Sequence, residues 1–164
     1  MCKKFWMPTA ALALILIPGK CLNAQTLTIT FSTATSGITL SGSGTSSATL
    51  GFGNVQALGG TVPSGVTKSL NGAINWSLST PVDVLVTKSG VTSASYALTA
   101  QLQSVDSTHT WNFGSATLNS SSPATVTLAG SYATATPYTL TLTIPFSASA
   151  GSISNSLDFI ATAN

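Results

Sequence analysis

Apolar residues alternate with small polar residues through most of this 164-residue chain. In the longest run, every second residue from Tyr138 to Phe146 is apolar, and threonine fills three of the four positions between them. A period of two residues places successive side chains on opposite faces of an extended strand, so that one face can be buried and the other hydrated. No window repeats with the period of a helix. The chain is therefore expected to be all-β.

Turn signals separate the alternating runs at short intervals. The sharpest is Asn71-Gly72, which predicts a tight hairpin between a strand near 66–70 and a strand that contains Trp76. About eight or nine short strands in one domain of this length predict a single antiparallel β-sandwich with Ig-like or jelly-roll topology.

The first residues have the three parts of a secretory signal peptide. Lys3 and Lys4 supply positive charge, residues 10–17 form an unbroken apolar run, and Ala24 is the small residue expected just before cleavage, so that Gln25 becomes the new N-terminus. The apolar run is far shorter than the roughly 20 residues of a membrane-spanning helix. We therefore expect export to the periplasm, the cell surface or the extracellular space, without a stable membrane anchor.

This assignment divides the chain into a signal peptide, 1–24, and one β-sandwich domain, 25–164. The domain has no cysteine, glutamate or arginine, and its two lysines and three aspartates give a formal net charge of −1. Its 140 residues include 25 Ser and 25 Thr. Threonine is β-branched and suits the hydrated face of a strand, so we expect a folded β-domain and not a disordered stalk. Without a basic patch, nucleic acid is not an expected partner.

Catalytic and cofactor motifs are not apparent in the domain. His109 is the only histidine, and Asp106 lies three residues before it, so a Ser-His-Asp set in an exported hydrolase is a third, disfavoured hypothesis. The segment around His109 lacks a G-x-S-x-G nucleophile elbow and is expected to be a polar hairpin loop. One histidine and no cysteine give no ligand set for a metal, and no cofactor is expected.

Aromatic residues offer a different kind of site. Trp76, Tyr96 and Tyr138 occupy the apolar phase of their runs, so core packing explains them first. Trp111 and Tyr132 lie near predicted loops and are the candidates for exposed rings that stack on a glycan. Packing in the core or at its rim is the competing and preferred interpretation of both.

Several short segments together resemble those of a known group of β-sandwiches. They are LGFGNV at 50–55, LTLTIPF at 140–146, AGSI at 150–153 and the closing LDFIATAN at 157–164. Their order resembles that in the spore coat protein U and fimbrial pilin group. The resemblance implies assembly by strand addition, in which an extended segment of one subunit completes the sheet of the next.

The segment 25–32 has the properties that strand addition requires. It is the first segment after the expected cleavage, it has no charge and no proline, and Leu27, Ile29 and Phe31 alternate with polar residues. The alternative is that it forms the first strand of its own domain, and we hold this to be somewhat the better interpretation.

These observations favour a non-catalytic exported structural or adhesive protein, pilin-like or a surface-assembly subunit. Its expected partners are further copies of itself or other surface subunits. The alternative is a secreted carbohydrate- or surface-binding module, with a glycan bound at Trp111 and Tyr132.

Overall fold

The computed structural model describes residues 25–33, 39–41, 47–51, 62, 64–149 and 153–164. The predicted signal peptide, 1–24, lies outside these residues. Within them all regular secondary structure is β-strand, as the alternation predicts. None of the described segments forms a helix that could cross a membrane.

The described part of the chain contains eleven strands. They are β1 (Thr26–Ser32), β2 (Thr39–Ser41), β3 (Ser47–Gly51), β4 (Thr67–Asn71), β5 (Asn75–Ser89), β6 (Tyr96–Leu102), β7 (Thr110–Phe113), β8 (Ala116–Leu118), β9 (Ala124–Gly130), β10 (Thr136–Pro145) and β11 (Ser154–Ala163).

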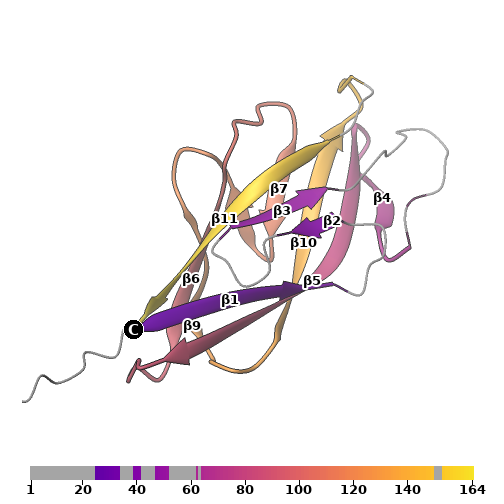
Figure 1. Cartoon of the computed structure of the whole chain (residues 1–164). Helices are drawn as coiled ribbons and strands as arrows, with labels where there is room; N and C mark the ends of the chain where they lie inside the picture. The colour runs from indigo at the N-terminus through magenta and orange to yellow at the C-terminus, as the bar shows by residue number, and fades with distance from the viewer. Residues whose placement is uncertain (1–24, 34–38, 42–46, 52–61, 63, 150–152) are drawn as a thin grey trace, which may run out of the picture.

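The strands form two antiparallel sheets in a β-sandwich-like arrangement (Figure 1). Sheet A has the order β1-β5-β10-β7-β8, and β4 also pairs with β5. Sheet B has the order β2-β3-β11-β6-β9. The prediction of an all-β fold built from antiparallel sheets is confirmed.

An aromatic cluster joins the two sheets across the core. Phe159 in β11 of sheet B lies with its ring centroid 4.6 Å from that of Phe31 in β1 and 5.1 Å from that of Phe113 in β7. Both of these partners belong to sheet A, and all three rings are buried. Burial of aromatic rings is a large contribution to folding, so these contacts fix how the sheets face each other.

The alternation predicts separate strands around Trp76 and around 82–86, but the structure joins them into β5, 15 residues long. Pro81 lies in the middle of this strand. Its carbonyl oxygen accepts a hydrogen bond from the Thr33 hydroxyl at 2.9 Å, which shows that its backbone polar groups face the edge shared by β1 and β4. β4 pairs with 75–79 and β1 with 83–89. Pro81 thus falls between the two ladders, where its missing N–H breaks no strand pairing.

The Asn71-Gly72 hairpin is confirmed, with β4 and β5 on its two sides. Its loop spans three residues, and Gly72 adopts a φ of 69°, which glycine reaches without the steric cost paid by other residues.

Rows of short polar side chains cross the outer face of sheet A. One row runs across five strands in register, through Thr67, Ser79, Thr141, Asn112 and Thr117. These positions alternate with the buried ones along their strands. The Ser and Thr residues that dominate the composition therefore cover the solvent side of this sheet.

β9 departs from the predicted phase. Val126 and Leu128 are expected on the inner face, but only Val126 packs against the core, and Leu128 is 73% exposed. The register between β6 and β9 shifts between Tyr96 and Leu98 and again between Leu98 and Thr99. Such irregularities change which face a side chain occupies, which local alternation cannot reveal.

Candidate functional site

Asp106 is the centre of the densest polar network in the described residues. Its Oδ1 accepts hydrogen bonds from the backbone N–H groups of Thr108, at 3.1 Å, and His109, at 2.9 Å. Its Oδ2 accepts from the indole Nε1 of Trp111 at 2.7 Å, and His109 Nδ1 lies 3.0 Å from both carboxylate oxygens. One carboxylate thus holds its own loop and reaches a side chain of the core.

Opposing effects act on the pKa of Asp106. Burial acts to raise it, but the hydrogen bonds from Trp111, from the backbone and ring of His109 and from the Thr108 N–H outweigh that effect. The pKa of the carboxyl is therefore lowered from its ordinary value, because these donors stabilise the ionised form.

The position of the His109 side chain suits a structural role and not that of a catalytic base. Its Nε2, the atom that would accept a proton from a nucleophile, is buried and has no hydrogen-bond partner among the described residues. A catalytic base must reach the proton that it removes. The pairing of Asp106 with His109 is thus present, but it does not extend to a serine.

The loop that carries this pair is not the predicted hairpin. It leaves β6 in sheet B and enters β7 in sheet A, so it crosses from one sheet to the other. A local pattern of polar residues marks a loop but does not say which sheet receives the next strand.

Trp111 is packed in the core, in agreement with the preferred interpretation, and the competing interpretation of an exposed ring that stacks on a glycan is wrong. Its side chain is 0% exposed and lies in the hydrophobic core, with the indole N–H turned toward Asp106. A fully buried ring offers no face to a glycan. Exposure is the competing interpretation because polar residues precede Trp111, but Trp111 is the second residue of β7, which begins at Thr110, and its ring points inward.

Tyr132 is half-buried at the rim of the core, in agreement with the preferred interpretation. Its ring centroid lies 5.2 Å from that of Tyr96, and the Lys88 ammonium lies 4.5 Å from it over the ring. Its hydroxyl donates to the carbonyl of Ser95 at 3.1 Å and lies 2.9 Å from the Ser93 hydroxyl. The ring and hydroxyl are thus already engaged within the domain.

The C-terminal residue is tied to the same region. The Asn164 side-chain amide donates to the Leu128 carbonyl at 2.8 Å and to the Ser95 hydroxyl at 3.0 Å. β11 is in this way linked to β9, which is not its neighbour in sheet B.

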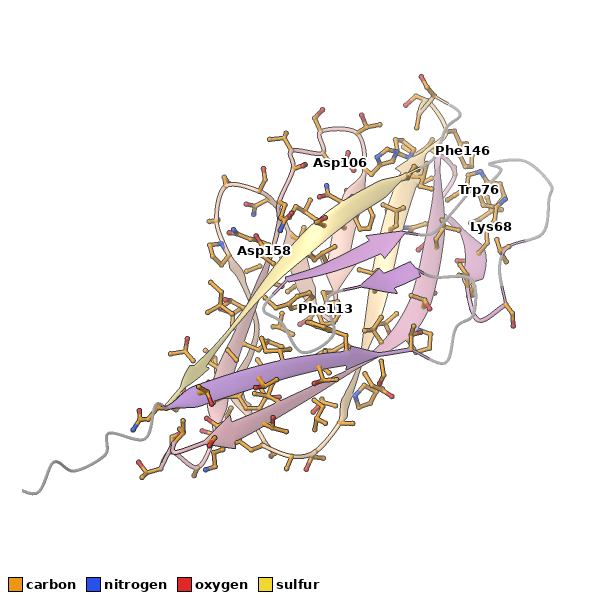
Figure 2. The ribbon with its side chains drawn as sticks, in the orientation of Figure 1. Lys68, Trp76, Asp106, Phe113, Phe146 and Asp158 are labelled. Atoms are coloured by element: carbon orange, nitrogen blue, oxygen red, sulfur yellow. The ribbon has the colours of Figure 1, made fainter. Side chains whose placement is uncertain are left out.

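An apolar cluster that the sequence does not predict lies at one end of the molecule, away from the C-terminal end of β11 (Figure 2). Leu70, Ile74 and Phe146 are 64%, 68% and 47% exposed. Trp76, expected in the core, is only half-buried and lies 5.6 Å from Phe146 between ring centroids. The Lys68 ammonium lies over the Trp76 ring, 4.7 Å from its centroid. The cluster unites the turn after β4 with the end of β10, where the Phe146 N–H donates to the Ile74 carbonyl at 2.8 Å.

The three aspartates of the domain are dispersed. Asp83 lies on the outer face of sheet A, between the buried Val82 and Val84, and Asp158 lies on the outer face of sheet B, between the buried Leu157 and Phe159. The described residues contain no group of three or more His, Cys, Asp or Glu side chains that could hold a metal ion.

The candidate strand-addition segment forms β1, which pairs with β5 of its own domain. Ile29 and Phe31 are 4% and 3% exposed, and Leu27 is half-buried. Their alternation therefore does place all three on the side of the core. The structure shows this segment within its own sheet, at the edge of that sheet.

Comparisons of the chain with protein-family models, with curated proteins and with solved structures find no match.

Proposed function

We propose that this chain is a non-catalytic exported structural or adhesive protein, a pilin-like or surface-assembly subunit that associates through 25–32. The observation that carries the proposal is the position of β1. It is an uncharged strand at a sheet edge, and two anchors, Ile29 and Phe31, fix it on its own sheet. Strand addition uses backbone pairing for affinity and alternate side chains for specificity, and this segment supplies both.

The surroundings of β1 support the same role. Its inward side chains meet Val84 and Val86 of β5 in register and the ring of Phe159 in the opposite sheet. A domain without β1 would therefore expose an apolar groove beside an unpaired length of β5. This is the surface to which an added strand would bind. The proposal includes an Ig-like or jelly-roll topology for the sandwich. It is also supported by the resemblance of the sequence to the spore coat protein U and fimbrial pilin group.

The chemistry of the described residues supports a role without catalysis. The Asp106–His109 pair is engaged with its own loop and with Trp111, and Asp83 and Asp158 lie on opposite outer faces of the sandwich. The predicted signal peptide supports export to the periplasm, the cell surface or the extracellular space.

Deletion of 25–32 from the exported form tests the proposal. Residues 25–164 should self-associate as concentration rises in size-exclusion chromatography and sedimentation velocity, and the deletion variant should not. A synthetic peptide of 25–32 should bind the deletion variant and raise its thermal stability. A matched peptide with Ser at Leu27, Ile29 and Phe31 should do neither. A full-length domain that stays monomeric at every concentration, or a deletion variant that associates like the intact domain, would contradict the proposal.

The exposed apolar cluster favours a second candidate, a carbohydrate- or surface-binding module. Clustered exposed apolar residues on a soluble domain mark interaction surfaces. In this case Trp76 and Phe146 replace Trp111 and Tyr132 as the rings that would contact a glycan. Phe146→Ala should weaken retention on an insoluble polysaccharide without a loss of thermal stability, while Tyr132→Ala should leave retention unchanged. Equal retention of both variants would exclude this site.

A further inference from the structure

The apolar cluster at the end of the molecule is one surface built from three segments of the chain. It comprises the exposed side chains of Leu70, Ile74 and Phe146 together with the half-buried Trp76. Trp76 pairs in register with Leu70, and its ring centroid lies 5.6 Å from that of Phe146 (Figure 2). Side chains from β4, β5 and the end of β10 are thus held next to one another.

The backbone fixes this surface before any partner binds. β4 pairs with β5 up to Asn71 and Asn75, and the turn 72–74 closes that hairpin. The Phe146 N–H donates to the Ile74 carbonyl at 2.8 Å, which ties the turn to the end of β10. The apolar side chains are therefore presented at the ends of paired strands, so that binding need not order a loop first.

The cluster is large enough to mark an interaction site but too small for a stable protein interface. With roughly 200 Å² for a large side chain, the exposed fractions of 64%, 68% and 47% for Leu70, Ile74 and Phe146 correspond to about 350 Å². Functional apolar patches on monomers reach roughly 300–600 Å². A standard protein interface buries roughly 800 Å² on each partner. A second copy held by this cluster alone would fall well short of that area.

The arrangement of the rings does not favour a sugar. The Lys68 ammonium already lies over the Trp76 ring, 4.7 Å from its centroid. The Phe146 ring is tilted by 48° to that of Trp76, so the two rings do not form a flat platform. Leu70 and Ile74, the most exposed members, have no ring to stack on a sugar. A partner that accepts aliphatic side chains suits this surface better.

We propose that the apolar cluster docks reversibly on a phospholipid bilayer. Leu70, Ile74 and Phe146 enter the boundary between headgroups and acyl chains, while Trp76 lies at the headgroup level, where the amphipathic indole is favoured. The two residues from Trp76 to Ile74 span roughly 7 Å of extended chain. This length matches the roughly 5–10 Å to which interfacial segments insert. The inference goes beyond the assembly function and does not depend on β1.

The turn limits how deeply the cluster can enter. The backbone polar groups of residues 72–74 need hydrogen-bond partners, which the hydrocarbon core of a bilayer does not offer. Insertion should therefore stop at the hydrated boundary. The contact is peripheral, in keeping with the expected lack of a stable membrane anchor.

Acidic side chains do not belong to the cluster. The chain has three, and Asp83 lies eight residues along β5 from Asn75, where it pairs in register with Ser32 and Pro137. Asp158 lies in β11 of sheet B, and Asp106 is engaged by its own loop and by Trp111. Lipid phosphates would therefore meet no carboxylate in the cluster itself.

Tryptophan emission of residues 25–164 tests the docking directly. The exported form has two tryptophans, Trp76 and the fully buried Trp111, so a change caused by lipid reports on Trp76. On addition of phosphatidylcholine vesicles, the emission should shift to shorter wavelength, and brominated phosphatidylcholine should quench it. The protein should also float with the vesicles in a density gradient. Unchanged emission without flotation would overturn the inference.

A double variant tests the surface. Leu70→Ser with Ile74→Ser should lower the partition coefficient onto these vesicles at least about tenfold. Leu128→Ser with Ile160→Ser is the matched control, because these side chains are 73% and 52% exposed in sheet B, outside the cluster. The control should bind within about twofold of the unmodified chain. Equal binding of the two double variants would contradict the proposed surface.

All four substitutions are at exposed positions, so the melting temperatures should change little. If Leu70→Ser lowers that of the double variant, Ile74→Ser alone, in the turn, should still weaken vesicle binding. Full vesicle binding by a folded Ile74→Ser variant would then overturn the inference.

Further outcomes separate lipid docking from the other proposals. A chain that self-associates through 25–32 but ignores vesicles would leave the assembly function standing and exclude lipid docking. Loss of self-association in the Leu70→Ser, Ile74→Ser variant without lipid would make a second copy the occupant of the cluster. Retention on an insoluble polysaccharide that needs Phe146, in a chain that ignores vesicles, would make the occupant a glycan. Either result would overturn the inference.

Discussion

β1 and β9 are both seven-residue strands at the outer edge of a sheet, yet they are built in opposite ways. β1 keeps one register along its whole length and buries two apolar anchors. β9 changes register against β6, exposes Leu128 and is tied through its backbone to Asn164. The difference teaches that an edge strand can be held by a regular ladder and buried anchors, or by an irregular ladder and a side-chain hydrogen bond from another part of its own domain.

The largest expected effect tests the anchoring of β1. Phe31→Ala removes a buried ring that packs on Phe159, so the free energy of unfolding should fall by about 3–5 kcal/mol, measured by urea denaturation. Leu27→Ala, at a half-buried position of the same strand, should cost clearly less. Equal losses for both variants would show that β1 is held by its backbone ladder alone.

Acid should weaken the other side of the molecule first. The lowered pKa of Asp106 means that the folded state favours its ionised form, so this stabilisation is complete above the ordinary carboxyl pKa of roughly 4 and is lost as pH falls through the folded value. The amides of 103–110, next to β6, should therefore lose protection from hydrogen exchange, relative to their intrinsic rate at each pH, below about pH 4 and before those of β1 do.

Asp106→Asn provides the control for the acid effect. It should lower stability at neutral pH by about 1–3 kcal/mol, since it weakens the network that holds Trp111. It should also remove the acid dependence of exchange in this loop. Unchanged acid dependence in the variant would assign the effect to another group.

An effect of similar size tests how β9 packs against β6. A Cβ on Gly130 would lie 2.3–2.7 Å from atoms of the buried Tyr96 ring, its partner in register. Gly130→Ala should therefore cost about 1–3 kcal/mol through overpacking. In a Tyr96→Leu background the same change should cost less, and a double-mutant cycle measures this coupling. Additive losses would place the origin of the penalty elsewhere.

The smallest effect lies in the turn that follows β9. Ala133 has a φ of 58°, which is unfavourable for a residue with a Cβ, and its N–H donates to the Val86 carbonyl at 2.9 Å. Ala133→Gly should relieve the backbone but increase the entropy of the unfolded chain, for a net gain of roughly 0.5 kcal/mol. A lower melting temperature for this variant would contradict the assigned strain.

The sequence predicts what depends on local alternation and turn chemistry. The all-β class, the Asn71-Gly72 hairpin and the inward phase of Ile29 and Phe31 follow from these local signals. β7 and β8 escape prediction because four and three residues are too few to show a period. Leu128 is misplaced because the register shifts that turn it outward arise from pairing with β6.

The polar network shows the same limit. Asp106 and His109 attract notice through their spacing, but the partner that fixes their role, Trp111, is identified only once the loop is seen to cross between sheets. The exposed cluster around Trp76 depends on β4, β5 and the end of β10 together. No single segment contains that information.

The hydroxyl rows on the outer face of sheet A have a consequence for the protein in its medium. This face is kept hydrated mainly by neutral groups, Thr67, Ser79, Thr141, Asn112 and Thr117 among them. At 0.1 M salt, dissolved ions screen the interactions between exposed charges that lie more than about 10 Å apart, but they have little effect on the hydration of neutral hydroxyl groups. At low to moderate salt, the solubility of this surface should therefore depend less on ionic strength than that of a surface kept hydrated by charged groups.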